Sequence, residues 1–485
     1  MIRGDNRGRG FVKTVDWALI AVYLLLVLIG WMNIYSASYS PDTAWYDFAG
    51  RSGKQLVWIA GAIGLGALIL FVIPPRLYET IAGPVYVVML VLLVAVIFLG
   101  TEHKGSNSWF SFGPVSFQPA ELSKISTSMM LAAFMGRYGY RMNSTRDLLV
   151  TLGILALPML AILMENETGS MLVYIGFVFM LYREGLSGWI IALGALIVVV
   201  FIVTLTKSPF SAILLAMTAI TLCNEIRCGR LKRWFAVYFP ILILLIAYAV
   251  VWYKVCDVRP DCLFSQFKPI YILIPFLVAL CLAYLIMGFR NISNFRLLSI
   301  GALVACVIMS FSVEFIFANV LQEHQRKRIE VLLGMTEDPS GVGYNVRQSM
   351  IAIGSGGFFG KGYLNGTQTT YGFVPGQSTD FIFCTIGEEW GFVGATLVIL
   401  LYVFLIWRIL RAAENSREGF TRIYGYCVAC CFFMHLVINI GMTIGLMPVI
   451  GIPLPFLSYG GSSLWSFTIM LFIFIALVRN ERRFF

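Results

Sequence analysis

Residues 17–36 read WALIAVYLLLVLIGWMNIYS, twenty residues without a charged side chain. A helix of about 20 apolar residues is long enough to cross the hydrocarbon core of a bilayer. Similar apolar runs recur along the chain, in which hydrophobic residues make up 59% of 485 and charged residues only 12%. A soluble domain has about a quarter of its residues charged. The sequence therefore predicts an all-α polytopic membrane protein.

Reading the apolar runs outward from this segment predicts about fourteen spans. They are residues 17–36, 55–74, 79–100, 118–137, 147–164, 169–183, 188–206, 209–224, 234–253, 269–289, 297–320, 378–407, 423–447 and 464–479. An even number of spans places both termini on the same side of the membrane.

The basic residues give the orientation. The net charge is +10, and most Lys and Arg residues fall in loops on the side of the termini, which is typical of topology signals and not of nucleic-acid binding. The positive-inside rule then predicts that both termini are cytoplasmic. The ten cysteines lie mostly in apolar runs. Only Cys256 and Cys262 share a predicted outer loop, where they could form a disulfide.

Three segments on the opposite side, 101–117, 321–377 and 448–463, are longer than connections need to be. We interpret 321–377 as a large outer loop with a function. It contains Asp338, which the following proline keeps out of helical geometry. This arrangement suits a carboxylate presented to a cleft, although Asp-Pro also opens ordinary turns.

The same loop contains basic residues on the side where topology signals are not expected. Arg326 and Arg328 could bind phosphate oxygens, or they could belong to a solvated run of charges. Lys361 lies among glycines, which suits a close approach to phosphate, but the spacing is not that of a Walker loop.

Charges inside or beside the spans are a further anomaly, because each buried charge costs roughly 2.5–3.5 kcal/mol on insertion scales. Glu121 and Lys124 are three residues apart, so they share a helix face and can form a pair. The other charges are Glu165, Glu167, Glu314, Asp380, Glu388 and Glu389. We interpret this set as lining a polar, outward-facing cavity between helices.

Four stretches of the chain resemble the SEDS family (shape, elongation, division and sporulation) of membrane peptidoglycan glycosyltransferases. They are FQPAELSK at 117–124, the stretch from Glu337-Asp338-Pro339 to Gln348, TDFIF at 379–383 with the residues up to Gly391, and GIPLPFLSYGGSS at 451–463. They occur in the family order, and the last is highly specific. Gly360-Lys361-Gly362 followed by Asn365-Gly366-Thr367-Gln368 is most similar to the rod-shape elongation (RodA-like) branch.

The resemblance implies that lipid II is polymerised on the outer face of the bacterial cytoplasmic membrane, for cell elongation and shape. It assigns Asp338 as the catalytic residue, acting as general base for an inverting transfer. It also implies that a class B penicillin-binding protein is the cross-linking partner. The sequence contains no dedicated metal cage and establishes no cofactor, so any divalent cation (Mg or Mn) would be shared with the substrate pyrophosphate. The expected substrate-binding residues are Trp109, Glu121, Lys124, Glu167, Arg326, Arg328, Lys361, Asp380 and Ser458.

The sequence departs from the family pattern in three places. The usual Gln-Pro-Asp-Leu-Gly reads Glu165-Asn166-Glu167-Thr168-Gly169, and Ser108 replaces the usual basic residue before Trp109. The family has ten spans, so we expect four inserted helices at 188–296. The family core would then consist of residues 1–183 and 297–485.

Two other functions remain open. A lipid II flippase or transporter would use the intramembrane charges as a translocation path, but it predicts repeated halves with broken helices, and we find no internal repeat. A scaffold that only recruits synthases predicts that Asp338 is dispensable.

Overall fold

The computed structural model describes residues 15–39, 47–48, 50–103, 106–112, 115–258, 267–291, 294–319, 323–335 and 341–484. Asp338 and Cys262 lie outside these residues. The chain folds into two compact units. The first unit comprises Met1–Leu186 and Glu337–Phe485, and the second comprises Ser187–Thr336.

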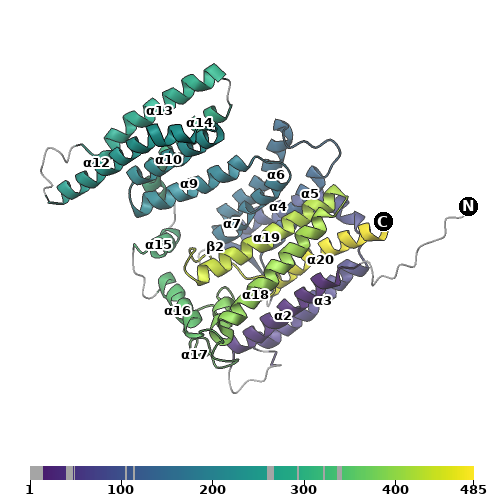
Figure 1. Ribbon diagram of the computed structural model, residues 1–485. Coiled ribbons are helices and arrows are strands. Elements are labelled where there is room, and N and C mark those ends of the chain that lie inside the picture. The colour runs from purple at the N-terminus through teal and green to yellow at the C-terminus, as the bar shows by residue number, and fades with distance from the viewer. Residues whose placement is uncertain are drawn as a thin grey trace, which may run out of the picture. The chain divides into compact units, whose positions relative to one another are not determined.

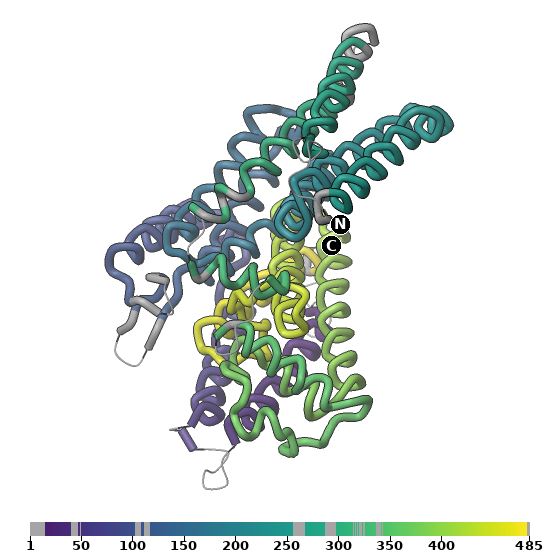
Figure 2. The backbone as a smooth tube through the Cα atoms, turned by 90° about the vertical axis from the view of Figure 1, so that its left-hand side faces the viewer, coloured from purple at the N-terminus to yellow at the C-terminus, as the bar shows by residue number. Residues whose placement is uncertain are grey.

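The first unit is a helical bundle built from both ends of the chain (Figure 1). Helix α20 packs against α3, α18 packs against α2 and α19, and α5 packs against α4 and α19. Helix α18 runs along the unit in both views (Figures 1 and 2). The helices are α2 (Trp17–Ala37), α3 (Arg51–Phe71), α4 (Arg76–Leu99), α5 (Pro119–Met135), α6 (Thr145–Met164), α7 (Thr168–Ile175), α8 (Phe177–Arg183), α16 (Val342–Ser355), α17 (Thr367–Thr370), α18 (Ile382–Glu414), α19 (Gly419–Thr443) and α20 (Gly461–Phe484).

The second unit has its own hydrophobic core, formed by residues such as Phe210, Leu273 and Leu303. Helix α10 packs against α9, α13 and α14. Its elements are α9 (Gly188–Thr206), α10 (Pro209–Arg227), α11 (Leu231–Arg233), the π-helix η1 (Trp234–Tyr238), α12 (Phe239–Val258), α13 (Pro269–Asn291), α14 (Asn294–Asn319) and α15 (Glu323–Leu332). This unit contains the predicted insertion and also extends past residue 296.

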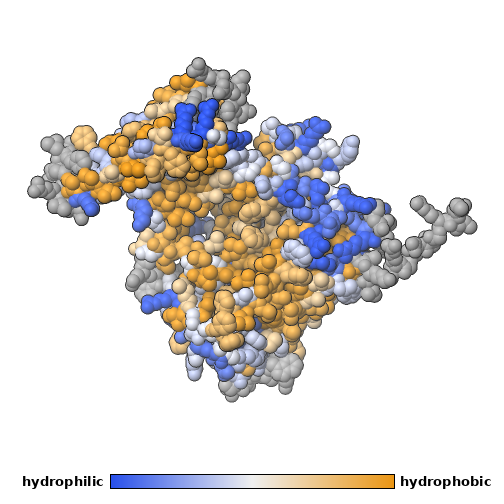
Figure 3. All heavy atoms as spheres, in the orientation of Figure 1, coloured by the Kyte–Doolittle hydropathy of each residue, from blue (hydrophilic) through white to orange (hydrophobic). Residues whose placement is uncertain are grey.

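A helix lies at each of the fourteen predicted spans. Within the described residues, eleven helical segments are long and apolar enough to cross a membrane. Helix α5, the pair α7–α8, and the apolar part of α14 do not meet that criterion, so the count of fourteen stays a prediction. Hydrophobic side chains cover the middle of the first unit, and hydrophilic ones gather at the end where the C-terminus lies (Figure 3). The chain is thus a multi-pass membrane protein.

Two segments expected to be loops contain regular structure. Residues 101–117 form a small antiparallel sheet of β1 (Thr101–His103), β2 (Ser106–Phe112) and β3 (Val115–Phe117), in which Phe110 pairs with Phe117. This segment, expected to be a loop, therefore carries a small sheet, while the spans themselves are helical. The expected outer loop 321–377 contains α15 in the second unit and α16 and α17 in the first.

Helix α18 is broken at Gly391, whose backbone is non-helical (φ 64°, ψ −161°). The break frees backbone groups, and the segment around Gly360 provides their partners. The carbonyls of Glu388 and Glu389 accept from the amides of residues 361 and 362, while the amides of residues 392 and 393 donate to the carbonyls of residues 357 and 358. Backbone groups within a membrane need such internal partners, so this exchange makes the break tolerable.

The two ends of the chain are joined through one carboxylate. Asp16, which is 4% exposed, accepts hydrogen bonds from Arg408 near the end of α18 and Arg482 near the end of α20. A buried carboxylate is stable only when it is paired in this way. Asp16 therefore fixes the start of α2 against the last helices.

The turn between α6 and α7 contains an unpaired acid. Glu165 is 1% exposed, and neither of its carboxylate oxygens has a hydrogen-bond partner within the described chain. The next residue, Asn166, adopts a left-handed conformation (φ 61°) that asparagine tolerates better than most residues. Burial, and secondly the charge of Glu167, raise the pKa of Glu165 to about 8.

We expect Gly360→Ala to lower the melting temperature of the detergent-purified protein by at least about 2 °C, because it costs more than about 2 kcal/mol. Gly360 has a φ of +81°, and a Cβ there would lie 2.1 Å from the Glu389 carbonyl oxygen. Gly153→Ala in α6 is the matched control, because a Cβ there meets nothing within 4 Å. Equal melting temperatures for the two variants would contradict this explanation of the break.

We expect Glu165→Gln to stabilise the protein in a pH-dependent way. Since the pKa of Glu165 is about 8 when folded and 4.5 ordinarily, the folded state holds this proton more tightly, and stability falls as pH rises from 4.5 to about 8. Glutamine does not titrate, so the variant does not lose stability in this way as the pH rises. The melting temperature of the variant should equal that of the wild type at pH 5 and exceed it by at least about 3 °C at pH 8.5. The exposed Glu79→Gln is the control, and a difference independent of pH would refute the prediction.

Candidate active site

Helix α5 carries a buried ion pair. Pro119 occupies the first turn of the helix, where its missing N–H costs nothing. The spacing of three residues places Glu121 and Lys124 on one face, and Lys124 Nζ lies 2.8 Å from Glu121 Oε1. Their side chains are 3% and 1% exposed. The predicted pair is confirmed, and its burial makes each charge dependent on the other.

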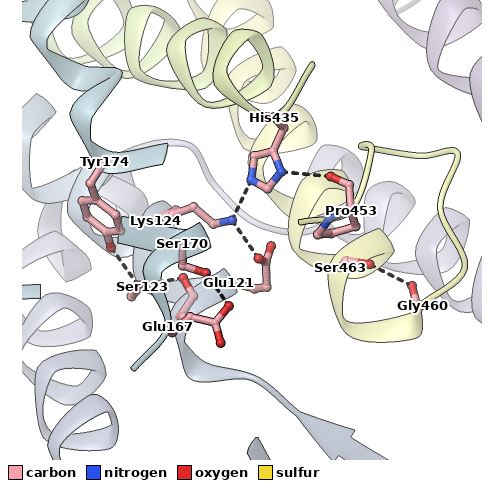
Figure 4. Close-up of polar contacts among 11 residues, drawn as sticks. Glu121, Ser123, Lys124, Glu167, Ser170, Tyr174, His435, Pro453, Gly460 and Ser463 are labelled. Atoms are coloured by element: carbon pink, nitrogen blue, oxygen red, sulfur yellow. Dashed lines mark hydrogen bonds and ion pairs between the residues drawn. The ribbon is translucent and has the colours of Figure 1, made fainter. Parts of the chain in front are cut away.

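The ammonium of Lys124 also reaches α19 and α20. It lies 2.8 Å from Nε2 of His435, which is fully buried, and 5.4 Å from the centre of the Phe467 ring. Nδ1 of His435 is 3.0 Å from the Pro453 carbonyl oxygen. Figure 4 shows this chain of contacts running from Glu121 through Lys124 and His435 to Pro453. The pair on α5 is thereby connected to the segment 451–463.

Ser458 holds the segment 451–463 against the residues before α18. Its hydroxyl donates to the Thr379 carbonyl oxygen (2.7 Å) and accepts from the Leu454 amide (2.8 Å). The Tyr459 amide donates to the Ser378 carbonyl oxygen (2.8 Å). With Ser458 only 2% exposed, its hydroxyl organises the backbone of both motifs.

Asp380 lies where these two motifs meet. A Cβ at Gly451 would be 3.3 Å from Oδ2 of Asp380, so glycine allows the carboxylate to approach the loop. The side-chain amide of Asn439 donates to the carbonyl oxygens of both Asp380 and Ile452, each at 2.8 Å. Asn439 therefore fixes Asp380 relative to the 451–463 segment.

Glu167 precedes the first residue of α7, and its side chain reaches the small sheet. Oε2 accepts from the Ser108 hydroxyl on β2 at 2.9 Å, and Oε1 accepts from Ser170 at 3.4 Å. Trp109, the next residue on β2, is partly buried, and its carbonyl accepts from Thr101 at 3.2 Å. The two departures from the family pattern, Ser108 and Glu167, are thus bonded to each other.

Lys361 lies in an anchoring network. Its ammonium is 2.7 Å from Oε1 of Glu388, which is fully buried, and 2.7 Å from the Thr367 hydroxyl. Glu388 also accepts from the amides of Gln368 and Thr369, each at 2.9 Å. The sequence predicts Glu388 as one of several charges around a polar cavity, and the structure shows which groups its carboxylate binds. It holds α17 against α18.

Glu389 has a separate contact, because it accepts a hydrogen bond from the Ser36 hydroxyl of α2.

Arg326 and Arg328 belong to α15 in the second unit. Arg326 Nε is 2.8 Å from Oε1 of Glu330, one helical turn away, and its guanidinium lies 5.4 Å from the centre of the Phe317 ring. Arg328 is partly buried and has its own contacts.

Sequence reasoning missed His435 and Asn439. A single histidine or asparagine in an apolar span has no local pattern that marks it. The only available signal was polarity itself, since both interrupt the apolar residues of 423–447.

Comparisons with known proteins were consistent with this arrangement of motifs. The family model described as "Cell cycle protein", which represents FtsW, RodA and SpoVE, matches residues 16–214 and 275–483. The unmatched residues 215–274 lie within the predicted insertion. The peptidoglycan glycosyltransferase MrdB of Escherichia coli is 29% identical over 93% of this chain and 90% of its own length.

Solved structures share the fold. A chain of a peptidoglycan synthase complex that coordinates polymerization and crosslinking matches with a TM-score of 0.57, covering 96% of this chain and 98% of that one. The rod shape determining protein RodA of Thermus thermophilus matches with a TM-score of 0.52 over 96% of this chain and 97% of that one. Both are 21% identical to this chain. The chain therefore belongs to the SEDS family of FtsW, RodA and SpoVE proteins, which are membrane peptidoglycan glycosyltransferases.

Proposed function

We propose that this chain polymerises lipid II into glycan strands on the outer face of the bacterial cytoplasmic membrane. The single observation that carries this proposal is the buried Glu121–Lys124 pair, bonded through His435 to the segment 451–463. Two stretches that resemble the family motifs, far apart in sequence, meet there. The match to MrdB, itself named a peptidoglycan glycosyltransferase, supports the same reaction.

In the proposed reaction the GlcNAc 4-hydroxyl of the acceptor attacks C1 of the donor MurNAc. Asp338 takes the hydroxyl proton, a new C–O bond forms with inversion from α to β, and the bond to undecaprenyl pyrophosphate breaks. A carboxylate base contributes typically about 10²–10⁴ in rate. The support for Asp338 is its place in the stretch from Glu337 to Gln348 that resembles the family motif.

Positive charge must offset the departing pyrophosphate. The proposed sources are some of Arg326, Arg328, Lys361 and Lys124, and the other proposed substrate-binding residues are Trp109, Glu121, Glu167, Asp380 and Ser458. Within the described residues, no three His, Cys, Asp or Glu side chains are grouped to hold a metal ion. We assign no step to a cation.

The elongation branch is the proposed cellular role, because of the stretch from Gly360 to Gln368. A class B penicillin-binding protein is the proposed partner, supported by the fold shared with a chain of a synthase complex. The basic loops support cytoplasmic termini. We also retain the proposal of ten family spans plus four inserted helices at 188–296, between core segments 1–183 and 297–485.

A lipid II flippase is the alternative. The charged residues between spans favour it, because a translocation path for a charged headgroup would need them. It differs from the main proposal in requiring no base.

We expect Asp338→Ala to reduce polymerisation of purified lipid II at least about 100-fold, because the acceptor hydroxyl loses its base. Glycan strands would be separated on gels after incubation with wild type or variant in liposomes. Glu337→Ala, the neighbouring acid, is the matched control and should retain activity.

The same liposomes distinguish the alternatives. Wild-type glycan strands from Asp338→Ala would refute the base assignment. Scrambling of lipid II by the wild type without polymer would favour the flippase, and normal growth of cells that carry only Asp338→Ala would favour the scaffold.

A further inference from the structure

His435 is a buried polar side chain of α19 that has no part in the proposed reaction. It is fully buried and bonded at both ring nitrogens. A carbonyl oxygen can only accept, so the proton of the ring must be on Nδ1, which faces the Pro453 carbonyl oxygen at 3.0 Å. A neutral imidazole carries one proton, and Nε2 is therefore an acceptor for the Lys124 ammonium at 2.8 Å.

This geometry decides where the Lys124 ammonium lies. A lysine on a flexible stem has three N–H donors and no preferred direction for them. Glu121 Oε1 accepts one donor and His435 Nε2 accepts another, both at 2.8 Å. The two acceptors sit on different helices, so removing either would leave the ammonium free to turn about the other.

The neutral charge of the imidazole also matters. Glu121 already balances the charge of Lys124, and a second carboxylate would leave an excess negative charge in a buried site. The neutral imidazole of His435 orients the Lys124 ammonium without adding a charge to the buried site. Oε2 of Glu121 has no hydrogen-bond partner within the described chain, so the pair still has an acceptor to offer a ligand.

We propose that His435 is a positioning residue, which holds the Lys124–Glu121 pair in register with the 451–463 segment through Pro453. This rests on the proposed function, since Lys124 and Glu121 are the substrate-binding residues that it positions. His435 touches no substrate in this scheme.

A purely structural role is the competing explanation. The His435 ring also packs edge-on against Phe467, with 4.8 Å between ring centroids and 83° between planes. Two substitutions separate the roles. His435→Phe keeps a ring for Phe467 but has no acceptor for Lys124, whereas His435→Gln keeps an acceptor but has no ring.

The test measures kcat and KM for lipid II polymerisation, with the melting temperature of each variant. We expect His435→Phe to lower kcat about 10- to 100-fold, as for a lost hydrogen bond to a charged group, with a smaller change in KM. His435→Gln should stay within about threefold of wild type. Cys427→Ala, a change at another fully buried residue of α19, should leave kcat unchanged.

The order of activities decides the outcome. A higher kcat for His435→Gln than for His435→Phe supports positioning. A kcat for His435→Phe equal to or above that of His435→Gln overturns it, and so do activities that merely follow the melting temperatures. If either variant does not fold, His435→Met replaces Phe and His435→Asn replaces Gln, with the same order expected. Should the wild type form no polymer, the proposed function fails. If it does and the order is reversed, only the role of His435 fails.

Discussion

A lysine ammonium buried among helices depends on acceptors that the protein supplies, because burial withdraws it from bulk water. Lys124 donates to one acceptor from its own helix and one from α19. The second acceptor is itself held by the carbonyl of Pro453. Residues 124, 435 and 453 thus have to be placed together. Asn439 and Ser458 then tie the same loop to the residues that precede α18.

Much of this could be predicted where the signal is local. Apolar runs of about 20 residues placed the helices, since length and composition alone decide whether a segment suits a bilayer. The spacing of Glu121 and Lys124 predicted their contact, because residues three apart share a helix face. The partner at His435 is 311 residues away from Lys124. No periodicity within either helix contains that information.

What the sequence does not predict also has physical reasons. A buried charge in the sequence indicates a polar environment, whereas the Glu388 carboxylate accepts the free amides at the start of α17. Sequence gives the cost of burying a charge but not which backbone donors offset it. The sheet at 101–117 was missed because its strands are short, and Ser108 within it pairs with Glu167 through a contact that sequence order hides.

The bonds of Asp16 have a consequence for biosynthesis. Its partners Arg408 and Arg482 follow it by 392 and 466 residues. At about 5–20 residues per second, a ribosome would need roughly 20–90 s to reach them. During that interval the first helices have left the ribosome, and the whole of 187–336 is made before the bundle can close. The newly inserted α2 and α3 must therefore wait in the membrane with their packing faces uncovered, which makes this period the one in which assembly factors could act.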